Sequence, residues 1–358
     1  MKKIGLLLLV SLFFGHLSAQ VVFRNLTLEE ALEVAEKEGK LVFVDFTAPW
    51  CCGCKLIESE LKNAKEFGEV MNKLCVCIQA DVDTKYGREL REKYIVPSLP
   101  TYLFLRPDGT LQHQFGSGTM IEFFVKKFWR AVDPYRCYSY YKSQYDAGNR
   151  EVSFLANYIE CLDEMGWEQM RDQVKEELWS KCSDQNKMTY FSLFFDTVLE
   201  EESKEMQFLI ANQDECRKRF NATRVDEILG TPIKNLMMKV IRQDTVLSKN
   251  QLNEWKKKAI QRGVMSEEMD FFFEITSSIC SGSMGKVYSV CLKGIEKVKD
   301  ERQRLSILSL LAEQAKEKKE IQICIEIGEK CLPLAVDHNW LGTKKQIIQK
   351  IETLKKKL

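Results

Sequence analysis

The feature that most constrains the fold is a short apolar run that leads into two cysteines. Residues 41–46 are apolar except for Asp45, and their length and β-branched content are typical of a buried strand. Cys51 and Cys54 follow at the start of a predicted helix that reaches about residue 73, with Asn63 as a candidate break. Unpaired N–H groups and the helix dipole lower the pKa of a thiol at such a position. The pattern therefore predicts a strand, a turn and a helix, with Cys51 at the helix N-cap and Cys54 one turn further in.

The flanking sequence predicts alternating helices and strands. Thr27 and Glu30 form a capping box that opens a helix ending at Gly39. The remaining expected elements are strands at 74–81, 101–105 and 111–115, and helices at 86–94 and 119–131. The early strand–helix–strand unit requires parallel strands, and a turn at residues 106–109 joins an antiparallel pair. We expect an α/β fold in residues 20–133, with a mixed central sheet flanked by helices.

These motifs, in this order, resemble the thioredoxin superfamily. The resemblance rests on Val-Asp-Phe-x-Ala-x-Trp-Cys-x-x-Cys-Lys at residues 44–55 and on Leu-Pro-Thr at residues 99–101. Residues 79–83 and 100–109 are similar to the periplasmic reducing domain of DsbD-type transmembrane reductases. The similarity covers about residues 25–132, and it implies a thiol–disulfide oxidoreductase that needs no cofactor.

The resemblance also implies roles for individual residues. Cys51 would attack a substrate disulfide, and Cys54 would resolve the mixed disulfide, leaving a redox-active Cys51–Cys54 disulfide. Asp45, whose pKa burial should raise, would accept the proton of the resolving cysteine. A cis peptide bond is expected at Pro100, rather than at the competing Pro97. The substrate-binding residues implied are Trp50 beside the cysteine pair and Leu99, Pro100 and Thr101, which would hold an extended substrate chain.

Two positions depart from the family pattern. The dipeptide between the cysteines is Cys52-Gly53 where thioredoxins carry Gly-Pro, so the family's reduction potential does not transfer. We expect Cys52 to point away from the pair as a bystander. Gln79 stands where many thioredoxins have a lysine near the buried Asp45, which should leave the pKa of Asp45 more strongly raised.

The N-terminal residues are typical of a secretory signal peptide. Lys2 and Lys3 precede an apolar run over residues 4–14, and Ala19 offers a small residue for cleavage before Gln20. The sequence thus predicts an exported protein, periplasmic or secreted, with residues 1–19 removed; an uncleaved anchor is the alternative. No other stretch predicts stable membrane insertion, and a formal net charge of +1 gives no reason to expect a nucleic-acid partner.

The cysteines outside the pair occur mostly within apolar patterns. The chain has 13 cysteines, and Cys75, Cys77, Cys161 and Cys324 each lie in an apolar helix or strand pattern. Free cysteine behaves as a small buried hydrophobe. Cys75 and Cys77 share one face of a predicted strand, so core packing fits them better than a zinc site, and no metal site is expected.

Residues 134–358 are predicted to form a separate, all-helical domain. Strand patterns end at Asp133-Pro134, and a succession of amphipathic helices follows. Helix pairs of this length are similar to solenoids of the tetratricopeptide class, although no fixed repeat consensus is present.

Three hypotheses for function follow. The first is an exported enzyme that reduces or isomerises disulfides in protein substrates and receives electrons from an unidentified donor, for which a membrane thiol reductase is one candidate. The second is an interaction or scaffold protein whose helical domain binds a partner, with the redox pair secondary. The third is thiolate binding of a soft metal such as Cu(I).

Overall fold

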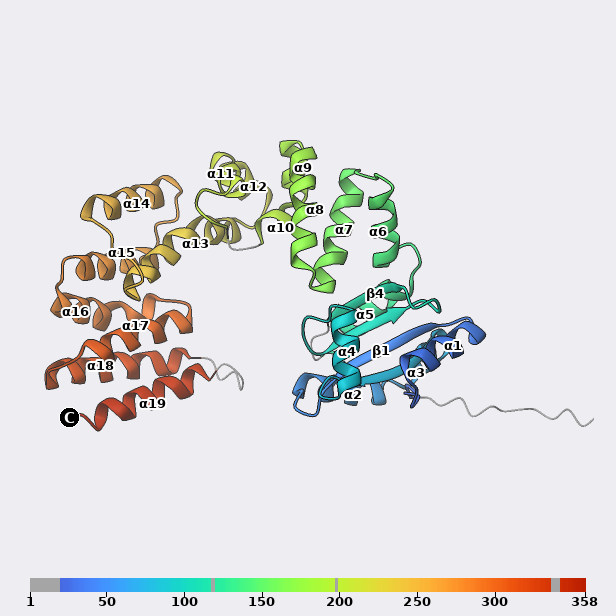
Figure 1. Ribbon diagram of the computed structural model, residues 1–358. Coiled ribbons are helices and arrows are strands. Elements are labelled where there is room, and N and C mark those ends of the chain that lie inside the picture. The colour runs from blue at the N-terminus through green and yellow to red at the C-terminus, as the bar shows by residue number, and fades with distance from the viewer. Residues whose placement is uncertain (1–19, 117–119, 197–198, 336–341) are drawn as a thin grey trace, which may run out of the picture. The chain divides into compact units, whose positions relative to one another are not determined.

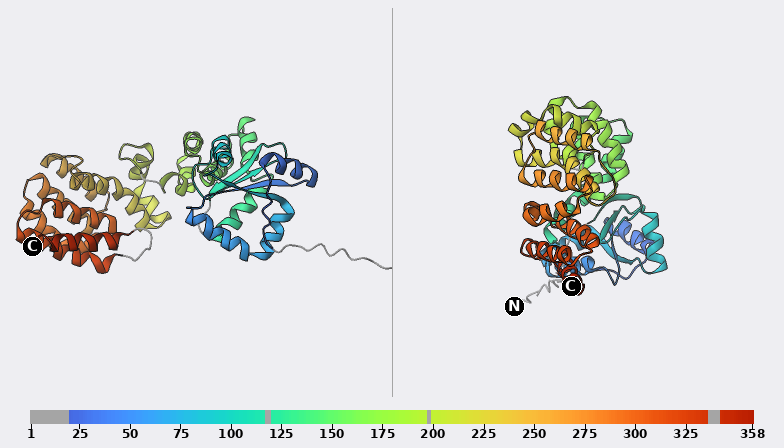
Figure 2. Two further views of the ribbon diagram at one scale, coloured as in Figure 1. Left: turned by 60° about the horizontal axis from the view of Figure 1, so that its bottom comes forward. Right: turned by 90° about the vertical axis from the view of Figure 1, so that its left-hand side faces the viewer.

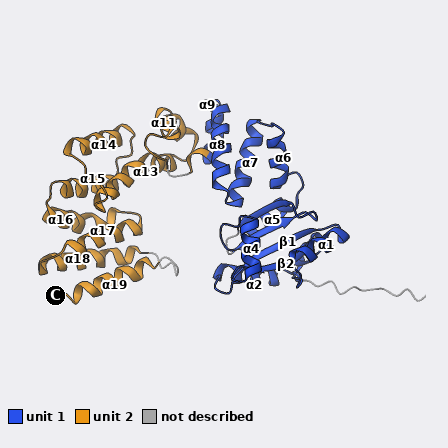
Figure 3. Ribbon diagram, viewed as in Figure 1, with its two compact units in different colours: residues 1–193 blue, residues 194–358 orange. Residues whose placement is uncertain are grey.

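The computed structural model describes residues 20–116, 120–196, 199–335 and 342–358. The predicted signal peptide therefore lies outside the described residues. The chain divides into two compact units, which meet between Leu193 and Phe194 and are described separately below (Figures 1 and 3). The first unit contains all the strands of the described residues.

The first unit is built on a mixed four-stranded sheet with the strand order β2-β1-β3-β4. Strand β1 (Leu41–Thr47) pairs in parallel with β2 (Cys75–Asp81) and antiparallel with β3 (Thr101–Leu105). Strand β4 (Leu111–Gly116) pairs antiparallel with β3 and closes the hairpin. The mixed sheet expected from the sequence is confirmed.

Helices cover both faces of the sheet because the strands alternate their apolar side chains. Val42, Val44 and Phe46 of β1 pack on one side with α1 (Leu28–Glu38) and α4 (Lys85–Lys93). Phe43 packs on the other side with α2 (Cys52–Asn63), α3 (Lys65–Leu74) and α5 (Ile121–Val132). Asp45, two residues after Phe43, points to this second side.

The predicted caps of the first helix are present. The capping box of Thr27 and Glu30 opens α1, and Gly39 ends it with a left-handed φ of 64°. The long helix expected after Cys54 is divided at Ala64 into α2 and α3.

Helices that follow residue 133 cover the outer edge of the sheet. Helices α6 (Tyr138–Asp146) and α7 (Val152–Met165) both contact β4 (Figure 1). The imidazole of His113 on β4 is fully buried, and its Nδ1 accepts a 3.1 Å hydrogen bond from the backbone N–H of Tyr138. The first compact unit therefore extends well past residue 133.

The rest of the chain is helical, as predicted. Successive helices of the second unit pack against their neighbours in the chain, for example α15 on α16 and α18 on α19 (Figures 1 and 2). The helices after α7 are α8 (Glu168–Lys181), α9 (Asp184–Thr189), α10 (Phe191–Phe195), α11 (Lys204–Ala211), α12 (Gln213–Arg219), α13 (Ala222–Ile241), α14 (Lys249–Gln261), α15 (Glu267–Cys280), α16 (Met284–Gly294), α17 (Glu301–Gln314), α18 (Lys318–Cys331) and α19 (Thr343–Lys355), with short 3-10 helices at Ile295–Lys297 and Leu332–Leu334. None of the described helices combines the length and the hydrophobicity that are needed to span a bilayer.

Candidate active site

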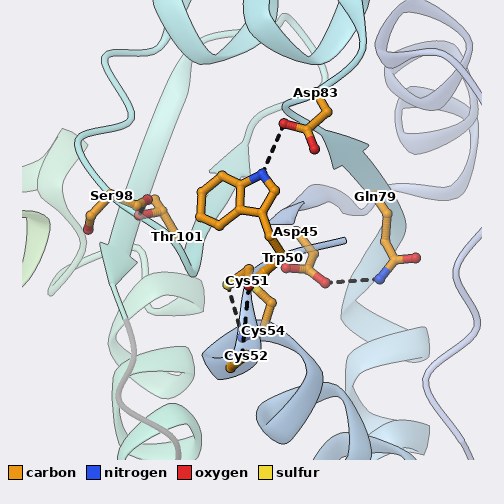
Figure 4. The surroundings of a disulfide bond; sticks show 9 residues. All are labelled: Asp45, Trp50, Cys51, Cys52, Cys54, Gln79, Asp83, Ser98 and Thr101. Atoms are coloured by element: carbon orange, nitrogen blue, oxygen red, sulfur yellow. Dashed lines mark hydrogen bonds between the residues drawn. A yellow bond between two sulfur atoms is a disulfide. The ribbon is translucent and has the colours of Figure 1, made fainter. Parts of the chain in front are cut away.

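The two cysteines of the motif lie at the N-terminus of α2. Cys51 is the N-cap residue, as predicted, and the backbone N–H of Cys54 donates to its Sγ at 3.1 Å. A disulfide joins Cys51 to Cys54 (Figure 4). Only 6% of Cys51 and 3% of Cys54 is exposed, so both cysteines are buried. This arrangement directs a backbone donor and the positive end of a helix dipole at the Cys51 sulfur.

Asp45 carries a buried carboxyl group on the strand that leads into the cysteine turn. Its Oδ2 accepts a 3.0 Å hydrogen bond from Nε2 of Gln79 on β2, and its Oδ1 is buried with no hydrogen-bond partner (Figure 4). Burial raises the pKa of Asp45 to about 6, the Gln79 hydrogen bond opposes that shift, and the charge of Glu58 on α2 adds to it. A carboxyl in this state exchanges its proton near neutral pH.

The loop before β3 is brought to the same end of the sheet as the cysteines. The Leu99–Pro100 peptide bond is cis, as expected, and no other cis bond occurs in the described residues. Thr101 pairs with Phe46 in the sheet register, which places the loop beside the end of β1. Leu99 and Pro100 are half-buried, and the hydroxyl of Thr101 donates to the carbonyl of Ser98 at 2.8 Å.

Trp50 lies at the surface next to the pair rather than in the core. Its side chain is 63% exposed, and its Nε1 donates to Oδ1 of Asp83 at 3.1 Å (Figure 4). No role was predicted for Asp83 from the sequence. The available signal was its position just after β2, because the carboxyl ends of the parallel strands β1 and β2 meet at one edge of the sheet.

Most cysteines outside the pair are buried, as predicted, and Cys52 is the exposed exception. Cys52 is free and exposed, and its only described hydrogen bond is a 3.9 Å contact with the carbonyl of Trp50. Cys75 and Cys77 pack in the apolar core, where burial raises the pKa of Cys77 to about 12. Of the eight other free cysteines, seven are buried and Cys280 is half-buried. In the described part of the chain, no group of three or more His, Cys, Asp or Glu residues could hold a metal ion.

Comparisons with known proteins agree with this geometry. A family model described as thioredoxin-like matches residues 23–107. Thioredoxin H1 of Arabidopsis thaliana is 31% identical over 91 residues, which are 25% of this chain and 75% of that protein. The chain belongs to the thioredoxin family.

Other relatives of this thioredoxin family member match over a similar length. An H-type thioredoxin of Oryza sativa subsp. indica is 39% identical over 75 residues, which are 21% of this chain and 56% of that protein. The thiol:disulfide interchange protein DsbD of Pseudomonas fluorescens is 32% identical over 84 residues, which are 23% of this chain and only 14% of DsbD. The chain thus spans a small part of DsbD and about half of the rice thioredoxin.

Proposed function

We propose that the protein is an exported thiol–disulfide oxidoreductase that reduces or isomerises disulfides in other proteins. The observation that carries this proposal is Cys51 at the N-cap of α2, with the N–H of Cys54 donating to its sulfur. A thiolate attacks disulfides and a thiol hardly does. A backbone donor and a helix N-terminus at Cys51 both stabilise the thiolate, so this sulfur is suited to be the attacking atom.

The reduction proceeds in two balanced exchanges. The Cys51 thiolate attacks one sulfur of the substrate disulfide, forms a mixed disulfide and releases the other substrate sulfur as a thiolate. Cys54 then gives its proton to Asp45, and its thiolate attacks the Cys51 sulfur. The Cys51–Cys54 disulfide forms, and the second substrate thiolate leaves. Two electrons have passed to the substrate, and an external dithiol must return them to the enzyme.

Substrate binding is assigned to the surface around the pair. Leu99, Pro100 and Thr101 would hold an extended chain through backbone hydrogen bonds, and the exposed ring of Trp50 would contact the same chain. The predicted signal peptide places this chemistry in the periplasm or outside the cell. The electron donor would then be a dithiol in that compartment, and a membrane thiol reductase is a donor of that class.

Replacement of each of two adjacent cysteines tests the proposal. Cys51→Ser should lower the dithiothreitol-dependent reduction of insulin to the uncatalysed rate. Cys52→Ser is the matched control and should keep full activity, since Cys52 is exposed and its described hydrogen bond goes to a backbone carbonyl. Cys54→Ser should accumulate mixed disulfides with partner proteins in the native compartment. Undiminished insulin reduction by Cys51→Ser would refute the proposal.

A further inference from the structure

Ile95 has a backbone conformation that its side chain disfavours. Its φ is 53°, and besides Gln243 it is the only non-glycine residue with positive φ in the described residues. A β-branched residue in this region is a true outlier, because the branched Cβ crowds the backbone. Glycine would take the same conformation without strain. The choice of isoleucine therefore needs a reason outside backbone geometry.

Hydrogen bonds to the surrounding backbone hold the conformation in place. The N–H of Ile95 donates to the carbonyl of Glu92 at 3.3 Å, and Nε of Arg91 donates to the carbonyl of Val96 at 3.1 Å. The side-chain amide of Gln114 on β4 reaches the carbonyl of Ile95 at 3.5 Å and that of Met165 on α7 at 3.4 Å. None of these bonds involves the side chain of Ile95, so none of them requires an isoleucine.

The C-terminal end of helix α7 also packs against the loop that contains Ile95. Gly166 ends α7 in a left-handed conformation and lies so close to the ring of Pro97 that a Cβ on the glycine would be 3.5 Å from it. Residues 95–97 are thus fixed between β4 and the end of α7, and they lead directly into the Leu99–Pro100 cis peptide.

The Ile95 side chain has no evident role inside the protein. It is 67% exposed, although its neighbour Val96 is buried in the core. Burial of an isoleucine side chain stabilises a protein or a complex, but this side chain gains little of that stabilisation within its own chain. Strain retained at an exposed apolar residue is typical of a binding surface.

We propose that Ile95 is a specificity-determining contact for protein substrates, binding an apolar side chain of the extended chain that lies on the Pro100 loop. The inference rests on the proposed function. Pro100 lies five positions after Ile95, and this spacing spans at most about 18 Å, a length that an extended substrate segment of five or six residues covers. A small disulfide compound has no peptide chain that could extend along the loop to Ile95. The residue should therefore select for proteins over small disulfides.

Two glycine substitutions separate binding from strain. Ile95→Gly removes both the apolar contact and the strain, so it should raise the Tm by about 2–4 °C while it raises the KM for insulin about 10-fold. Its kcat/KM for hydroxyethyl disulfide should stay unchanged. Gln243→Gly is the matched control, because Gln243 has a φ of 63° in the second unit. That variant should gain stability and keep the insulin KM.

Two further variants control for loop flexibility. Ile95→Asn tolerates the left-handed conformation without the freedom of glycine and should show the same rise in insulin KM. Ile95→Leu keeps an apolar side chain and should stay within about twofold of the original KM. An Ile95→Gly enzyme with the original insulin KM would overturn this inference alone. A wild-type chain that reduces neither insulin nor hydroxyethyl disulfide would instead overturn the proposed function, and the inference with it.

Discussion

At the scale of single residues, the buried carboxyl of Asp45 should make the stability of the fold depend on pH. Its pKa in the folded protein is about 6, above the value of 3.8 for a free carboxyl. Its contribution to stability is therefore fully present below pH 3.8 and is lost as the pH rises through 6. Asp45→Asn removes the buried charge and should raise the free energy of unfolding at pH 8 by about 2–3 kcal/mol.

The same substitution should slow the resolving step by about 100-fold, because no carboxylate would accept the Cys54 proton. Urea unfolding at pH 4 and pH 8, with rapid-mixing measurement of mixed-disulfide decay, checks both effects. Equal stability gains at the two pH values would contradict the assignment of the charge to Asp45.

Residues of the site differ in how far sequence could predict them. The position of Cys51 at a helix start and the burial of Asp45 follow from local patterns, an apolar run and a strand–helix junction. The bond from Trp50 to Asp83 joins residues on two different elements, so only the paired strands bring them together. The positive φ of Ile95 could not be predicted, because sequence preference argues for the opposite conformation.

At the scale of elements, the buried histidine on the outer strand β4 leads us to predict that acid destabilises the folded protein. Burial lowers the pKa of His113 to about 3, with smaller contributions from the charges of Arg130 and Lys127. The neutral imidazole contributes its full stability above the unfolded pKa of about 6.5, and this is lost as the pH falls toward 3. Between pH 7 and pH 5 the folded protein should therefore lose about 2 kcal/mol through this residue.

His113→Asn tests this prediction with a side chain that does not titrate but can still accept the Tyr138 hydrogen bond. The variant should be less stable than the wild type at pH 7, and the difference should shrink by about 2 kcal/mol at pH 5. Comparing the two proteins at each pH by urea unfolding cancels the titration of every other group. A difference that stays constant with pH would argue against a neutral, buried His113.

The burial of β4 could not be predicted from the sequence pattern of the strand itself. The strand and the helices after Pro134 were each predicted from local patterns. Gln112, His113 and Gln114 are all buried, yet three consecutive polar residues are typical of an exposed edge. Their partners lie on α5, α6 and α7, and no periodicity within β4 indicates which helices will cover it.

At the scale of the whole molecule, the predicted thioredoxin-like domain, residues 20–133, is shorter than the compact unit that contains it, which reaches Leu193. Backbone groups of α6 and α7 bond Nδ1 of His113 and Nε2 of Gln114, and both helices contact the edge strand. A fragment of residues 20–133 should therefore lose these bonds and expose β4. The buried apolar side chains of α6 and α7 no longer contribute in the fragment, at about 25 cal/mol per Å² of apolar surface, and an open edge favours association. Compared with residues 20–190, the short fragment should unfold about 5–10 °C lower and form oligomers. Calorimetry measures the Tm, and sedimentation velocity measures the oligomeric state. Equal Tm values for the two fragments, both of them monomeric, would show that residues 20–133 fold without α6 and α7.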